Sequence, residues 1–148
     1  MSQRVATTGS VMMSSSPKQY DRGTAVWVVD PFFDKKTAQA NDPSKVGESR
    51  PFLILSDSNT HPFHSNQFIA VLMTLQHHPD AWTLQDSDWV TSPPQKTSYV
   101  SPWVVMTPDW TDIEGGDTAP DQRDATLGEI DPATVDGIAR SVPQYIGI

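Results

Sequence analysis

Residues 46–57 read "VGESRPFLILSD", and this stretch decides how the centre of the chain folds. The run FLILS at 52–56 is short and apolar, which is typical of a buried strand. Arg50 lies just before the start of that strand, and Pro51, the next residue, restricts the backbone there. Three interpretations of Arg50 are open: a salt-bridge anchor, a phosphate clamp, or a solvated charge that ends a loop.

Four further segments read as strands on either side of this one. Residues 24–30 are β-branched and aromatic, and 67–75 are apolar enough to be covered on both faces. Residues 81–85 alternate between apolar and polar side chains, as a half-buried strand does. Residues 98–107 form the last predicted strand, in which Pro102 implies an edge position or a bulge.

The end of the chain changes from strand to helix signals. Asp131 is placed to cap a helix, and Pro132 suits its first position. An apolar stripe follows at i, i+3, i+4 and i+7: Val135, Ile138, Ala139 and Val142. Pro143 ends or kinks the helix. The predicted fold class is therefore mainly β with α: a small antiparallel barrel or half-open sheet of about five strands, covered by one C-terminal helix.

The length of 148 residues fits one domain. Residues 1–20 are rich in Ser and Thr without periodicity and are predicted to be disordered, so the folded domain is expected at 21–148. Residues 31–49 read as a long loop of the kind that is often functional. No apolar run approaches the length of a membrane span or of a secretory leader, so we expect a cytoplasmic protein with no membrane partner.

Charge is distributed unevenly along the chain. The net charge is -8, and residues 107–136 hold nine acidic side chains against Arg123 alone. Residues 31–50, in contrast, carry a small local excess of positive charge. Fifteen of the 18 acidic residues are Asp, which favours a surface adapted to high salt. The alternative is an acidic region that binds a basic partner.

Several classes of catalytic site are excluded by the sequence. It contains neither phosphate-binding glycine motif, no G-x-S-x-G elbow, and no cysteine for a thiolate nucleophile or metal ligand. His61 and His64 have i, i+3 spacing, but Pro62 between them argues against a helix that would aim both rings at one metal. We therefore expect no metal site and no cofactor.

Arg50 and Thr74 form the strongest candidate pair. Consecutive antiparallel strands bring the start of one strand to the end of the next, and Arg50 opens the second predicted strand while Thr74 closes the third. A guanidinium beside a hydroxyl suits a phosphate, and the same pair would stabilise the charge of a phosphorane. The structural alternative is a salt bridge from Arg50, for example to Asp30, with Thr74 merely ending its strand.

The order of these segments resembles the PemK/MazF family of toxins from type II toxin–antitoxin systems. The resemblance rests on "RGTAVWVVDP" at 22–31, "ESRPFLILSD" at 48–57, "FIAVLMT" at 68–74, "SYVSPWVV" at 98–105 and "GEIDPATVDGIARSVPQYIG" at 128–147. It implies an SH3-like barrel with a C-terminal helix that forms a homodimer. It also implies a metal-independent endoribonuclease, in which a ribose 2′-OH of single-stranded RNA attacks the adjacent phosphorus. A cognate antitoxin would be the protein partner, and DNA would be contacted only through that antitoxin.

The resemblance also assigns roles to residues. The family's motif arginine falls on Arg50, which would neutralise the phosphorane or assist proton transfer, and its motif threonine falls on Thr74, which would bind a phosphate oxygen. Around this catalytic pair we expect substrate-binding residues in the neighbouring loops: Lys45, Glu48, Ser49 and His64. His61 or His64 is a further candidate for acid–base chemistry.

Two departures from the family keep another interpretation open. The predicted strand at 98–107 lacks the Asp and Arg with which many members help to bind RNA, and the chain is strongly acidic for an RNA-binding protein. The alternative function is a non-catalytic SH3-like binding module, or a module that regulates transcription only together with its antitoxin.

Overall fold

A computed structural model describes residues 19–29, 49–62, 67–113 and 126–147 of the chain. The strands are β1 (Thr24–Val29), β2 (Ser49–Ile54), β3 (Ala70–Thr74), β4 (Trp82–Thr83), β5 (Tyr99–Met106) and β6 (Thr126–Glu129). The helix α3 (Pro132–Ser141) and the 3₁₀ turns η3 (Asp86–Asp88), η4 (Trp110–Asp112) and η5 (Val142–Tyr145) accompany the strands. Residues 1–18, which are most of the segment 1–20 predicted to be disordered, lie outside the described residues. So do residues 31–48, which are most of the predicted loop at 31–49.

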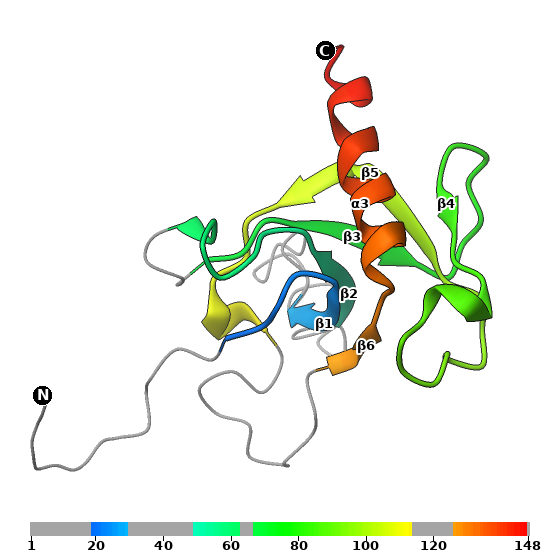
Figure 1. The fold of residues 1–148 in the computed structure, drawn as a ribbon, viewed down its shortest axis with the longest axis horizontal. Helices are drawn as coiled ribbons and strands as arrows, with labels where there is room; N and C mark the ends of the chain where they lie inside the picture. The colour runs from blue at the N-terminus through cyan, green and yellow to red at the C-terminus, as the bar shows by residue number, and fades with distance from the viewer. Residues whose placement is uncertain (1–18, 30–48, 63–66, 114–125, 148) are drawn as a thin grey trace, which may run out of the picture.

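The six strands form one antiparallel sheet in the order β4-β5-β3-β2-β1-β6. Figure 1 shows this sheet curling around itself, with α3 lying across one of its faces. The predicted class, mainly β with a C-terminal helix, is confirmed. The curled sheet is a half-barrel, because no ladder joins its two end strands, β4 and β6, in the described residues.

The expected number of strands was one too few. Strand β6 covers only Thr126–Glu129, and it pairs with β1 through Thr24–Glu129 and Ala25–Gly128. Its four residues include a glycine, show no alternation of apolar and polar residues, and follow a long acidic stretch. A strand of this kind is stabilised mainly by its pairing with the neighbouring strand, here β1, so its own sequence gives almost no indication that it is a strand.

Two bulges bend the sheet. On β5, Ser101 pairs with Leu72 and Val105 with Val71, so the three residues from Pro102 to Val104 bulge out of the ladder. Of the two alternatives predicted for Pro102, an edge position or a bulge, the structure shows the bulge. On β6, Leu127 is an extra residue between those that pair with Ala25 and Val26 of β1. Bulges increase the local twist and re-aim side chains, which produces the curl seen in Figure 1.

Each face of the sheet has its own apolar core. The first core lies beneath α3 and contains Ala25, Leu53, Val71, Met73, Leu84, Trp89, Val100, Ile130, Val135 and Ile138. The second lies on the opposite face and contains Val26, Val28, Phe52, Ile54, Phe68, Ala70, Trp110 and Ile113. Neighbouring residues of β1 and β2 therefore alternate between the two cores, as the pleat of a strand requires.

Helix α3 begins and ends as predicted. The Asp131 side chain accepts a hydrogen bond from the Ala133 N–H at 3.1 Å, and Pro132 occupies the first turn. The helix gives way to η5 at Val142, directly before Pro143. None of the helices in the described ranges is long and apolar enough to cross a membrane.

Helix α3 is attached to β4 through Trp82. The indole N–H of Trp82 donates to Ser141 Oγ at 3.3 Å, and Ser141 Oγ–H donates to the Ile138 carbonyl at 2.6 Å. Gly137 makes the close approach of the ring possible, because a Cβ at that position would lie 2.8 Å from Trp82 Cη2. The helix is thereby fixed against the sheet at its edge strand, β4.

Candidate functional site

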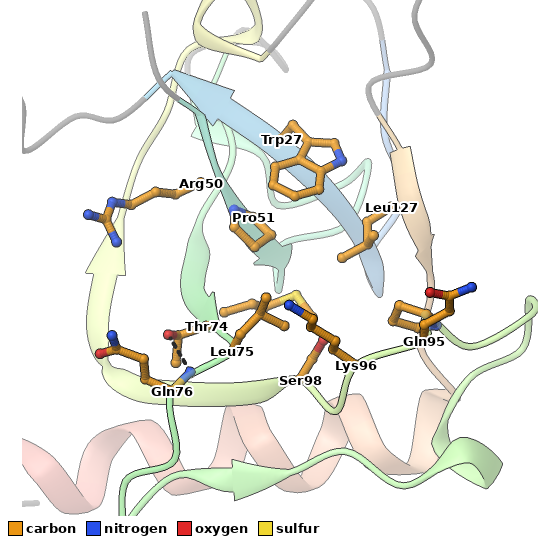
Figure 2. Close-up of a pocket in the computed structure, with 12 residues that line it drawn as sticks. Trp27, Arg50, Pro51, Thr74, Leu75, Gln76, Gln95, Lys96, Ser98 and Leu127 are labelled. Carbon is orange, nitrogen blue, oxygen red and sulfur yellow. Dashed lines mark hydrogen bonds between the residues drawn. The ribbon is translucent and has the colours of Figure 1, made fainter. Parts of the chain in front are cut away.

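A pocket of about 710 Å³ opens at the end of the sheet where β2 begins and β3 ends. Strands β1, β2, β3 and β6 and the segment before β5 contribute to its wall. The lining residues are Trp27, Arg50, Pro51, Met73, Thr74, Leu75, Gln76, Pro94, Gln95, Lys96, Ser98 and Leu127. Figure 2 shows them surrounding the opening from both sides of β2.

Arg50 and Thr74 meet at this pocket because of the pairing between β2 and β3. The ladder joins Phe52 to Leu72 and Ile54 to Ala70. Extending that register by two residues sets Arg50 opposite Thr74, and both residues line the pocket. The sequence-based expectation that they share one end of the sheet is therefore met.

The two side chains are presented differently. Arg50 is exposed, and its neighbours Val28 and Pro51 hold the backbone through the pairing of β1 with β2. Thr74 is half-buried, and its Oγ1 accepts the Gln76 N–H at 3.1 Å. Because that bond uses a lone pair of the oxygen, the hydroxyl hydrogen remains directed elsewhere and can be donated to a ligand.

The pocket has the opposite charge to the rest of the chain. None of the described residues that line it is Asp or Glu, although the chain carries 18 of them. Its charged side chains are Arg50 and Lys96, in a protein of net charge -8. A concave site lined by one sign of charge focuses the field and attracts ligands of the other sign. The pocket therefore favours an anion.

One half of the pocket is mainly apolar and is formed by Trp27, Pro51 and Leu127, with the amide of Gln95 beside Leu127. Figure 2 shows Arg50 and Thr74 on one side of Pro51, with Trp27 and Leu127 on the other. This division follows from the pleat, since Arg50 and Pro51 are consecutive residues whose side chains leave opposite faces of β2. An anionic group and a flat apolar group that are joined to each other would suit the two halves.

Not every predicted site residue can be placed. Lys45, Glu48 and His64 lie outside the described residues. Ser49 directly precedes Arg50 at the start of β2, where its backbone pairs with Val29 of β1. The structure describes nothing further for its side chain.

His61 lies away from the pocket and has a packing role. Its ring is buried, and its Nδ1 accepts from Ser56 Oγ–H at 2.6 Å, while Nε2–H donates to the Tyr20 carbonyl at 3.2 Å. This assignment follows because the carbonyl can only accept. The ring also packs edge-on against Phe68, with centroids 4.8 Å apart. His61 therefore ties residue 20 to the segment between β2 and β3, and the acid–base role considered for it does not fit this position.

The turn before His61 explains how that ring is aimed. The Asp57 carboxylate accepts the N–H groups of Asn59 and Thr60 at 2.9 and 3.1 Å. These bonds, that from the Asn59 N–H above all, hold the pKa of Asp57 below its ordinary value. The charged carboxylate thus closes the turn from which His61 enters the core.

Sequence reasoning missed five polar or aromatic residues of the pocket: Trp27, Gln76, Gln95, Lys96 and Ser98. Lys96 gave no signal in the sequence, because its position in the pocket depends on the pairing of β3 with β5, which are not consecutive strands. Trp27 gave no signal either, because it was one of five tryptophans in a chain whose core needed several.

Among the residues that the structure describes, no group of three or more His, Asp or Glu side chains is placed to hold a metal ion. The described wall of the pocket instead supplies a guanidinium, an ammonium, two hydroxyls and two amides, from Arg50, Lys96, Thr74, Ser98, Gln76 and Gln95.

Solved structures with the same fold include bacterial endoribonucleases. A mycobacterial endoribonuclease is 22% identical with a TM-score of 0.55, over 88% of this chain and 94% of that one. A mycobacterial endoribonuclease in complex with its cognate antitoxin is 22% identical with a TM-score of 0.52, over 92% and 97%. A chain of the MazE–MazF complex from Deinococcus radiodurans is 18% identical with a TM-score of 0.57, over 88% and 98%.

These likenesses cover nearly the whole of each chain, and they show a MazF-like fold. The resemblance read from the sequence is thereby confirmed at the level of the fold. Neither a scan against protein-family models nor a search of the curated proteins found a match to this chain.

Proposed function

We propose that this protein is the toxin of a type II toxin–antitoxin pair, an endoribonuclease that cleaves single-stranded RNA. One observation carries the proposal: Arg50 and Thr74, which the β2–β3 register sets opposite each other, line one pocket without acidic residues in its described wall. The MazF-like fold and the endoribonucleases that share it supply the reaction class.

The proposed reaction is an internal transfer at phosphorus. The ribose 2′-oxygen attacks the adjacent phosphorus, its proton passes to a base, and the bond from phosphorus to O5′ breaks as O5′ gains a proton. The products are a 2′,3′-cyclic phosphate and a 5′-hydroxyl. Arg50 would pair its N–H groups with the non-bridging oxygens, where charge accumulates, and Thr74 would donate its hydroxyl to one of them. A guanidinium keeps its proton near neutral pH, so Arg50 would stabilise charge and would not act as the base.

The partners follow from the same comparison and are proposed with it. The similar mycobacterial and Deinococcus proteins were crystallised with an antitoxin or as MazE–MazF complexes. We expect a cognate antitoxin to inhibit this protein by lying across the pocket, where acidic side chains would meet Arg50 and Lys96. We also expect a homodimer, and DNA contact only through the antitoxin.

Product analysis tests the reaction. Purified protein is incubated with a mixed-sequence single-stranded RNA in the presence of excess EDTA. We expect cleavage at an unchanged rate, because the proposed chemistry uses side chains of the protein, with 5′-hydroxyl and 2′,3′-cyclic phosphate ends identified by mass spectrometry.

The same RNA with 2′-O-methyl riboses is the control, and it should stay intact because its 2′-oxygen has no proton to lose. Products with 5′-phosphate ends, or cleavage that stops with EDTA, would contradict the proposed reaction. Absence of any cleavage, together with normal growth when the protein is induced in cells, would favour the non-catalytic binding module.

A further inference from the structure

We propose that the apolar half of the pocket, formed by Trp27, Pro51 and Leu127, is a nucleobase subsite, and that Lys96 binds a phosphate beside it. The inference deepens the proposed function by naming how the RNA is held. Its test measures binding without cleavage, so the two proposals can fail separately.

Trp27 is placed to stack on a base. It lies on β1 opposite Pro51 and is half-buried, so part of its indole remains accessible from the pocket. Trp89 and Trp110 are buried in the two cores, while Trp82 is bonded to α3. Trp27 is the tryptophan that lines this pocket. Stacking of a base on an aromatic face is favourable for every base, because each has a π-face.

Leu127 completes the apolar half because of the bulge in β6. As the extra residue between the partners of Ala25 and Val26, it is freed from the regular alternation of the strand. Figure 2 shows its side chain in the pocket on the same side of Pro51 as Trp27. Without this bulge the wall next to Trp27 would be formed by a different residue.

The polar groups around this half match the edge and backbone of a nucleotide. Gln95 lies beside Leu127 (Figure 2), and a side-chain amide both donates and accepts, as the edges of bases do. Lys96 follows Gln95 and brings a second cation to the pocket, in addition to Arg50. Successive phosphates of a single strand need separate cations, and a base between them needs a flat apolar face.

A nucleotide strand is favoured over a peptide by this combination. An acidic peptide could pair its carboxylates with Arg50 and Lys96. Such a peptide would have no particular need for the indole face of Trp27, or for the Leu127 side chain that the bulge in β6 places in the pocket. The pocket volume of about 710 Å³ is within the range that encloses a small organic group such as a base with its sugar.

Binding to uncleavable strands tests the subsite. Two fluorescent probes are titrated by anisotropy: a short mixed-sequence 2′-O-methyl RNA, and an abasic 2′-O-methyl strand of the same length and charge. We expect Trp27→Leu to weaken binding of the first probe by about 5- to 150-fold and to leave the abasic strand unchanged. Trp27→Phe should retain affinity within about threefold, which excludes misfolding as the cause. Trp103→Leu, at an exposed tryptophan outside the pocket, is the matched control and should change neither.

Lys96→Gln should behave in the opposite way. It should weaken both probes equally and reduce the slope of log affinity against log salt by about one. The proposal is overturned if Trp27→Leu affects both probes alike or neither of them, or if Lys96→Gln leaves the salt slope unchanged. It is also overturned if neither probe binds while the cognate antitoxin binds in a Trp27-dependent manner, since the pocket is then a protein site. Base-dependent binding without cleavage of ordinary RNA would leave the subsite standing and contradict the proposed nuclease.

Discussion

Replacing Arg50 with alanine is expected to lower the rate of RNA cleavage by at least about 100- to 1,000-fold, the loss typical of removing one charge-stabilising donor from a transition state. Arg50 supplies the charged donor in the pocket that Thr74 also lines. Since Arg50 is exposed, its truncation should leave the melting temperature nearly unchanged. Cleavage is measured with a quenched fluorescent RNA, and growth arrest on induction gives the readout in cells.

Two further variants make this prediction specific. Arg50→Lys keeps the charge and loses the two-pronged donor geometry, so it should recover only part of the activity. Arg22→Ala is the matched control: Arg22 is also partly exposed, and it pairs with Asp136 of α3, outside the pocket. It should keep full activity. An Arg50→Ala protein that still cleaves RNA and arrests growth like the unmodified protein would remove Arg50 from the mechanism.

Replacing Gly128 with alanine is expected to destabilise the fold by about 2–3 kcal/mol, as overpacking of a core does. A Cβ at this position would lie 2.6 Å from Thr91 Oγ1 and 2.8 Å from Trp89 Cζ3. Trp89 is a buried, rigid ring of the core beneath α3, so it cannot simply turn away. We expect a melting temperature lower by several degrees, read by circular dichroism or calorimetry.

A double variant separates the two close contacts. Thr91 Oγ1 accepts the Glu129 N–H at 3.0 Å, so Thr91→Ala alone should also destabilise the protein, by about 1 kcal/mol. If Thr91 Oγ1 causes part of the clash, Gly128→Ala with Thr91→Ala should lose less than the sum of the single losses. A Gly128→Ala protein with unchanged stability would show that β6 can shift away from Trp89, contrary to the packing described here.

The central strands, and the position of Arg50 and Thr74 at one end of the sheet, could be predicted because their signals are local. The apolar runs at 52–56 and 67–75 are consecutive strands, separated by only ten residues. Their order in the chain therefore predicts that they pair antiparallel, with the start of the first beside the end of the second. The cap at Asp131 and the bulge at Pro102 could be predicted for the same reason, since each depends on a single residue and its immediate neighbours.

The rest of the site depends on contacts between distant segments. Strand β6 forms on the free edge of β1, about a hundred residues earlier in the chain, and Leu127 enters the pocket only through the bulge in that pairing. His61 was considered for acid–base chemistry because it lies in the loop between the second and third predicted strands, but its hydrogen bonds to Ser56 and Tyr20 reflect packing between segments. Trp27 could not be distinguished from the core tryptophans, because its accessibility depends on which side chains cover it.

The contrast between an acidic chain and a pocket lined with two cations and no described carboxylate has a kinetic consequence. Far from the pocket, an RNA strand meets the field of a molecule with net charge -8 and is repelled. That long-range repulsion is screened over a Debye length of about 10 Å at 0.1 M salt, while the short-range attraction inside the pocket is screened less. A first addition of salt would therefore speed the association of RNA with the protein, and only higher salt would weaken the binding of RNA in the pocket. Productive capture of RNA would be fastest at an intermediate ionic strength, whereas a uniformly basic nuclease would slow from the first addition of salt.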